Sequence, residues 1–187
     1  MSTVAERARL KISVFLGHPE PCHPAQQAFV DALGAYLDSR GIAPRTLGAA
    51  DSGAGTPLKA VRRVMLESNG VVTVALRQPL GSDLAAVTRE PGREGTLRGA
   101  WLTSPWAHVE SAMAYQLGLP VLVLREQGVR ADGMLEPGAA GVYMPSFRVG
   151  AGSEGYFSTS EWNDLFWKWE SRVRAVVERK GEPPALY

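Results

Sequence analysis

The stretch that decides the fold is SPWAHVESAMAYQLGLPVLVLRE, residues Ser104–Glu126. It begins with a helix-capping serine, Ser104, and a proline that suits a first helical turn. Its second half, PVLVLRE, is a run of branched apolar residues that follows Gly118 and Pro120. Such a run is typical of a strand that is buried on both faces. The stretch therefore predicts a helix followed by a buried strand.

A carboxylate, Glu110, lies within the apolar face of this predicted helix. The helical period places it on the same side as Trp106, Met113, Ala114 and Leu117. Burying a carboxylate costs several kcal/mol unless the group is paired or protonated. We therefore expect Glu110 either to belong to a functional site or to pair with an arginine at the edge of the core.

Outward from this stretch, strand and helix patterns alternate. We expect further strands at residues 11–17, 42–48, 71–77 and 141–149. Helices are expected at residues 23–41, ending at Gly41, and at residues 56–70, with Thr56 as N-cap and Pro57 at the first helical position. This alternation predicts an α/β protein, and specifically a flavodoxin-like, doubly wound, mostly parallel sheet with helices on both faces and an appended C-terminal helix. The chain of 187 residues suits a single domain, 1–187, with a core unit at 11–126 and an extra strand and helix at 127–187.

The composition excludes several classes of protein. Lysine and arginine number 20 against 19 aspartate and glutamate residues, so no net field favours a nucleic acid or an anionic membrane. The single cysteine, Cys22, cannot form an internal disulfide and fits a reducing compartment. No apolar run is long enough to span a membrane, and the N-terminus lacks a signal-peptide core. We expect a cytoplasmic globular protein.

Three segments are expected to meet at one site, because parallel sheets bind ligands at the carboxyl ends of their strands. They are Gly17–Pro19, Leu76–Gln78 and Ser104–Glu110. The connection Arg77–Thr103 is long for this fold and contains several arginines, and loops of this length are often functional. Its arginines are Arg77, Arg89, Arg93 and Arg98.

The three histidines and the cysteine lack the paired spacing of metal ligands, so no metal site is predicted. His108 lies two positions from Glu110 and therefore faces away from it, towards Tyr115. We expect His108 at the helix surface or at an interface. His18 closes the first strand, where it could meet a ligand or cap a turn.

The C-terminal segment predicts a second amphipathic helix. Ser158 and Glu161 have the spacing of a capping box, and Trp167 falls off the apolar face, among polar residues that include Glu170 and Arg174. An exposed tryptophan indicates a contact surface, and with the Tyr115 face it predicts a homodimer. A tryptophan covered by a neighbouring loop is the alternative. The apolar face itself consists of Trp162, Leu165, Phe166, Trp169, Val173 and Val176.

The motifs VFLGHP and S-P-W-x-H-V-E-x-A-M-A-Y-x-L-G-L-P-V-L-V-L resemble the nucleoside 2-deoxyribosyltransferase-like and bacterial TIR-like group over residues 11–126. Proteins of this group cleave or exchange N-glycosidic bonds of nucleosides, nucleotides or NAD. The resemblance implies that Glu110 is the catalytic carboxylate and that a nucleoside, nucleotide or dinucleotide is the ligand, with no separate cofactor. It implies ligand contacts from Gly17, His18, Pro19, Arg77, Ser104 and Trp106.

The chain departs from that pattern at two places. Where the group has an aspartate after the third strand and D-x-G-T before the Glu helix, this sequence has Arg77–Gln78 and WLTSPW. The acid that serves the leaving base is therefore not identified; Asp83 and Glu90 are the candidates. Arginines suit a phosphorylated or dinucleotide ligand.

Two other interpretations stay open. HPEP at His18–Pro21 also resembles the loop of flavin-dependent quinone reductases that cradles the FMN phosphate, although Cys22 and His23 replace the expected hydroxyl or amide donors. Alternatively, the nucleotide pocket binds without turnover, as in a sensing or scaffold module.

Overall fold

The protein is described from a computed structural model that covers residues 12–47, 56–79, 101–150 and 153–179. Strands and helices alternate in this order: β1 (Ile12–Gly17), α1 (Pro24–Ser39), β2 (Ile42–Arg45), α2 (Pro57–Leu66), β3 (Val71–Ala75), α3 (Pro105–Gln116), β4 (Val121–Arg125), η2 (Gly133–Leu135), β5 (Val142–Tyr143), α4 (Ser153–Tyr156) and α5 (Ser160–Glu178). Most of the long arginine-containing connection, including the candidate acids Asp83 and Glu90, lies outside the described residues.

The described strands form one sheet in the order β2-β1-β3-β4-β5. Every pair of neighbouring strands is parallel, and Gly17 at the end of β1 is in register with Thr73 of β3. This order is that of flavodoxin-like sheets, in which the chain changes direction between β1 and β3. The predicted fold class is confirmed, and the carboxyl ends of β1 and β3 mark the expected ligand position.

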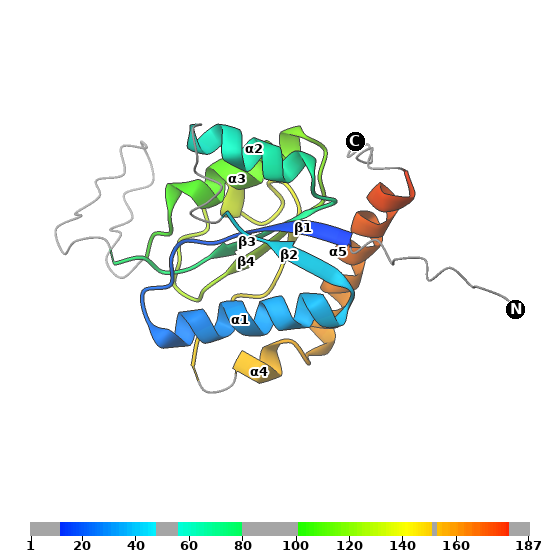
Figure 1. The fold of residues 1–187 in the computed structure, drawn as a ribbon. Helices are drawn as coiled ribbons and strands as arrows, with labels where there is room; N and C mark the ends of the chain where they lie inside the picture. Colours follow the sequence, from blue (N-terminus) through cyan, green and yellow to red (C-terminus); the bar gives the residue numbers. More distant parts are fainter. Residues whose placement is uncertain (1–11, 48–55, 80–100, 151–152, 180–187) are drawn as a thin grey trace, which may run out of the picture.

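Helices cover both faces of the sheet (Figure 1). Alternate side chains of each strand divide the core, because successive strand residues point to opposite faces. Val14 and Leu16 pack with α1 and α5, whereas Phe15 between them packs with α2 and α3. The face of α1 and α5 is rich in aromatic rings, including a stacked pair, Phe29 and Phe147, whose centroids are 3.7 Å apart.

The helix signals in the sequence hold at α1 and α2. Helix α1 ends beside Gly41, whose φ of 74° requires the left-handed conformation that glycine adopts without strain. Thr56 is the N-cap of α2 and Pro57 occupies its first turn, as the sequence predicts.

Helix α5 buries its predicted apolar face but differs from the sequence prediction at two residues. Its N-cap is Thr159, whose Oγ1 accepts a hydrogen bond from the Trp162 amide at 3.1 Å, and not Ser158. Glu170, predicted on the polar side, is only 3% exposed. Trp167 is 65% exposed, so its predicted position off the apolar face is confirmed. Homodimer formation through it remains a prediction.

The buried Glu170 carboxylate connects α5 to the end of α1. It accepts hydrogen bonds from the guanidinium of Arg40 at 2.8 Å and from Arg174 one turn along α5, also at 2.8 Å. In turn, Glu170 raises the pKa of Arg40 by hydrogen bonding and by charge. Burial of this carboxylate is tolerated because both of its oxygens have charged partners.

Neither a membrane span nor a metal cluster occurs in the described part of the chain. No described helix is long and apolar enough to cross a membrane. No group of three or more His, Cys, Asp or Glu side chains among the described residues could hold a metal ion.

Replacing Glu170 by glutamine should destabilise the protein by about 2 kcal/mol, because the neutral amide cannot accept two charge-assisted pairs in a buried position. Urea unfolding of the purified variant measures this loss. Asp164→Asn removes a carboxylate from an exposed position on the same helix and should change stability by no more than about 0.5 kcal/mol. Equal effects of the two substitutions would show that the Glu170 contacts do not support the fold.

Candidate functional site

A cavity of about 370 Å³ lies where the sequence predicts a site. The loop after β1, the residues after β3 and the first turns of α2 and α3 enclose it. Each of the three predicted segments contributes to its wall, so the prediction that they surround one cleft is confirmed. The lining residues are His18, Pro19, Glu20, Leu47, Pro57, Val61, Gln78, Ser104, Trp106 and Glu110.

Glu110 lines this cavity and is only 8% exposed. Among the described residues, no donor forms a hydrogen bond or an ion pair with its carboxylate. Loss of solvent raises the pKa of Glu110 from its usual 4.5 to about 7. Of the loop arginines that could pair with Glu110, Arg77 bonds elsewhere, to the Gln127 carbonyl, whereas Arg89, Arg93 and Arg98 lie outside the described residues. Buried, unpaired carboxylates with raised pKa values are typical of functional sites.

Glycine at position 17 is what lets the Glu110 carboxylate lie against the sheet. A β-carbon on Gly17 would be 2.2 Å from the Glu110 Oε2 atom, well inside van der Waals contact. Gly17 therefore serves the site by lacking a side chain and forms part of the floor under Glu110. The predicted contact of Gly17 with a ligand remains a prediction.

Helix α3 packs against the sheet through small residues. As a result, the face that the helix buries is rotated about the helix axis relative to the predicted face. The buried positions are Ala107, Glu110, Ser111 and Ala114. Ser111 Oγ and Thr73 Oγ1 share a buried hydrogen bond of 2.9 Å between α3 and β3. Large side chains could not approach so closely, so Met113 and Leu117 of the predicted stripe are only partly buried.

The entrance to α3 forms one side of the cavity. Ser104 caps the helix, its Oγ accepting a hydrogen bond from the Trp106 amide at 3.3 Å. Trp106 is 41% exposed and lies at the cavity wall rather than in the core. An exposed indole at a cavity wall offers a surface on which a flat ring can stack.

His18 and Pro19 line the cavity on the β1 side. The His18 ring is held by a contact of 2.8 Å between its Nδ1 atom and the Pro19 carbonyl oxygen. Both residues lie where the sequence predicts ligand contacts, and the roles assigned to them there remain predictions.

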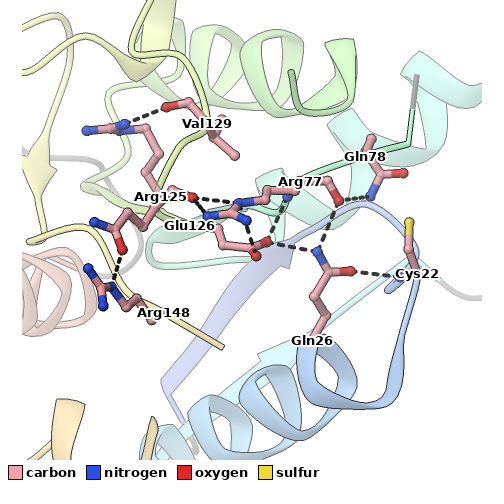
Figure 2. Close-up of polar contacts among 9 residues, drawn as sticks. Cys22, Gln26, Arg77, Gln78, Arg125, Glu126, Val129 and Arg148 are labelled. Atoms are coloured by element: carbon pink, nitrogen blue, oxygen red, sulfur yellow. Dashed lines mark hydrogen bonds and ion pairs between the residues drawn. The ribbon is translucent and has the colours of Figure 1, made fainter. Parts of the chain in front are cut away.

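Arg77 is not among the residues that line this cavity, and its predicted role as a ligand contact remains a prediction. Its guanidinium binds the Gln127 carbonyl and lies 3.5 Å from the Glu126 carboxylate. Figure 2 shows Arg77 directed towards Glu126. The cause is a buried hydrogen-bond network. Glu126 accepts from the Arg77 amide at 2.8 Å and from Gln26 at 2.8 Å, and Gln26 also bonds the Arg77 carbonyl. Gln78, the next residue, faces the cavity instead.

Sequence reasoning missed part of the cavity wall. Glu20 directly follows the predicted segment Gly17–Pro19, and Gln78 is the last residue of the predicted segment Leu76–Gln78. Both could therefore have been found from their places at strand ends. Leu47, Pro57 and Val61 come from the β2–α2 side, and only the strand order brings that side to the cavity. His108 lies outside this cavity, with its Nε2 atom 3.8 Å from Asp132, in agreement with its predicted place away from Glu110.

Comparison with known proteins gives similarity at the level of fold. Two solved structures resemble this chain at 14% identity each. One is the Clostridium botulinum CMP N-glycosidase BcmB, with a TM-score of 0.46, covering 82% of this chain and 98% of that chain. The other is a conserved protein from Enterococcus faecalis V583, with a TM-score of 0.42, covering 86% of this chain and 98% of that chain. No protein-family model and no curated protein matches the sequence.

Substituting Gly17 by alanine should cost about 1–3 kcal/mol, because the new methyl group overlaps the Glu110 carboxylate. In a Glu110→Ala background the cost should be smaller, with a coupling of about 1 kcal/mol in the double-mutant cycle. Gly34→Ala is the matched control, since a β-carbon there meets nothing within 4 Å. Additive effects of the two substitutions in urea unfolding would contradict the contact.

Glu110→Gln should stabilise the protein, increasingly so as the pH rises. Below pH 4.5 both the folded and the unfolded carboxyl are protonated; between pH 4.5 and about 7 the unfolded chain loses its proton first, and wild-type stability falls. Above that range the raised pKa corresponds to a penalty on the order of 3 kcal/mol, which glutamine removes. Thermal unfolding at pH 5 and pH 8 measures the difference. The exposed Glu136→Gln should change stability by no more than about 0.5 kcal/mol at either pH.

Proposed function

We propose that the protein cleaves or exchanges the N-glycosidic bond of a nucleoside, a nucleotide or NAD, with Glu110 facing the anomeric carbon of the sugar. One observation carries this proposal: the Glu110 carboxylate is buried in a cavity wall and has no partner among the described residues. The motif around it, which resembles the nucleoside 2-deoxyribosyltransferase-like and TIR-like group, supports the same role.

The chemistry of N-glycoside cleavage requires an anion of this kind. Positive charge develops at the anomeric carbon as the bond to the base breaks, and a nearby carboxylate stabilises it or forms a covalent intermediate with it. A desolvated carboxylate interacts more strongly than one in water, since the local dielectric constant is low. With a pKa of about 7, Glu110 is largely ionised in weakly alkaline solution. We therefore expect cleavage that releases a neutral leaving group, such as nicotinamide, to become faster as the pH increases through 7.

The remaining walls of the cavity suit a nucleoside-sized ligand. Its volume of about 370 Å³ is within the usual range for small-molecule sites. Trp106 offers a stacking face for a base, and Leu47 and Val61 provide apolar contact. Ser104 and Gln78 supply hydrogen-bonding groups at the wall. Arg77 is bound to Glu126 and Gln127, so the argument that it recognises a phosphate no longer supports a phosphorylated substrate.

Binding without turnover is the second candidate function. It is favoured by the lining of the cavity, because the only other carboxylate that the described residues place there, Glu20, is exposed and not held in a buried position. The flavin interpretation is less well supported. The Cys22 amide, in the loop expected to hold an FMN phosphate, is bonded to Gln26 Oε1 at 2.7 Å.

Glu110→Gln should lower kcat/KM by about 100-fold or more while leaving ligand affinity nearly unchanged, because the lost charge acts mainly in the transition state. The assay is release of free base or nicotinamide from a panel of nucleosides, nucleoside monophosphates and NAD. Glu136→Gln, which removes an exposed carboxylate outside the cavity, is the control and should retain wild-type rates.

Undiminished turnover by Glu110→Gln would remove Glu110 from the mechanism. Tight binding of a panel compound without release of its base by the wild type would instead establish the binding module.

A further inference from the structure

The His18 ring has a defined arrangement of hydrogen-bonding atoms. Its Nδ1 atom lies 2.8 Å from the Pro19 carbonyl oxygen. A carbonyl oxygen only accepts, so Nδ1 must carry the hydrogen in this contact. Nε2 is then the ring nitrogen that is not engaged by this contact. No described residue forms a hydrogen bond or an ion pair with Nε2.

His18 and Glu110 line the same cavity. Both line its wall, and the residue before His18, Gly17, is the one against which the Glu110 carboxylate packs. The half-buried imidazole therefore lies beside the position proposed for the sugar, on the β1 side. Histidine is the side chain that ordinarily exchanges protons near neutral pH.

We propose that His18 is the acid that protonates the leaving base, through Nε2, while Glu110 faces the sugar. This inference rests on the proposed function. As the bond between the anomeric carbon and the base nitrogen breaks, its electron pair goes to the base, which takes the Nε2 proton. Water then adds its oxygen to the anomeric carbon and returns a proton to Nε2. The sum is nucleoside plus water giving free base plus sugar.

Leaving groups differ in their need for such an acid, and this difference supplies the test. Hypoxanthine leaves inosine as an anion unless it is protonated, whereas nicotinamide leaves nicotinamide riboside as a neutral molecule. Protonation by a positioned side chain contributes roughly 10²–10⁴-fold where it is needed. His18 should therefore matter for the first substrate and not for the second.

The experiment measures kcat/KM for inosine and nicotinamide riboside, and for their 5′-monophosphates, with wild type and two variants. His18→Asn keeps a donor near the Nδ1 position and removes Nε2, and His18→Gln places an amide near the Nε2 position. Both variants should lose about 100-fold or more on inosine or its monophosphate and about 3-fold or less on the nicotinamide partner. His23→Asn, an exposed histidine at the N-cap of α1, is the control and should match wild type on all four.

Equal losses on both leaving groups would overturn the acid role of His18 and leave it a positioning residue. Undiminished activity on both would overturn its role entirely. In either case wild-type turnover keeps the proposed function intact. Failure of the wild type to release a base from any of the four compounds would overturn the inference for these leaving groups. The proposed function itself would fall only if the wild type released no base from the whole panel of nucleosides, nucleoside monophosphates and NAD.

Discussion

The contact between the Glu110 carboxylate and Gly17 is the constraint on which the site depends. It joins α3 to the end of β1 at the point where the chain changes direction across the sheet. The approach is possible because Gly17 has no side chain and because α3 meets β3 through small residues, with Ser111 bonded to Thr73. A larger residue at either place would move the carboxylate away from the sheet and change the shape of the cavity.

Comparison of the buried glutamates shows why Glu110 differs from a structural residue. Among the described residues, Glu110, Glu126 and Glu170 are all less than 9% exposed. Glu126 accepts hydrogen bonds from Gln26 and from the Arg77 amide, and Glu170 accepts from two arginines. Glu110 has no such partner within the described part of the chain, and burial raises its pKa to about 7. Among the described residues, the fold therefore compensates for the charge of two buried carboxylates and provides no charged or hydrogen-bonding partner for the third.

The features set by local chemistry were predictable from the sequence. Pro57 and Gly41 bound their helices as expected, and the alternation of helices with apolar runs predicted the sheet class. The same logic located the cavity, because carboxyl ends of parallel strands meet at one edge. Glu110 was predictable for a different reason: a carboxylate on an apolar helical face needs an explanation.

What could not be predicted depends on residues far apart in the chain. The direction of the Arg77 side chain is set by Glu126, which is itself held by Gln26, 100 residues away in sequence. Burial of Glu170 depends on Arg40, 130 residues earlier. The residue pattern within one segment cannot predict such long-range pairs, because each segment taken alone is equally compatible with its charged side chain being exposed to solvent. The rotation of α3 has the same origin, since it follows from the close approach of Ser111 to Thr73.

The most direct measurement is the position of a nucleoside relative to Glu110. Pseudouridine and formycin have carbon–carbon links between sugar and base and so resist cleavage, and a crystal structure of either complex would locate the anomeric carbon. The account predicts that this carbon lies within about 4 Å of a Glu110 carboxylate oxygen, near the distance required for reaction. A nucleoside whose sugar is directed away from Glu110 would contradict the account. So would a nucleoside that binds beside Trp106 but outside the cavity.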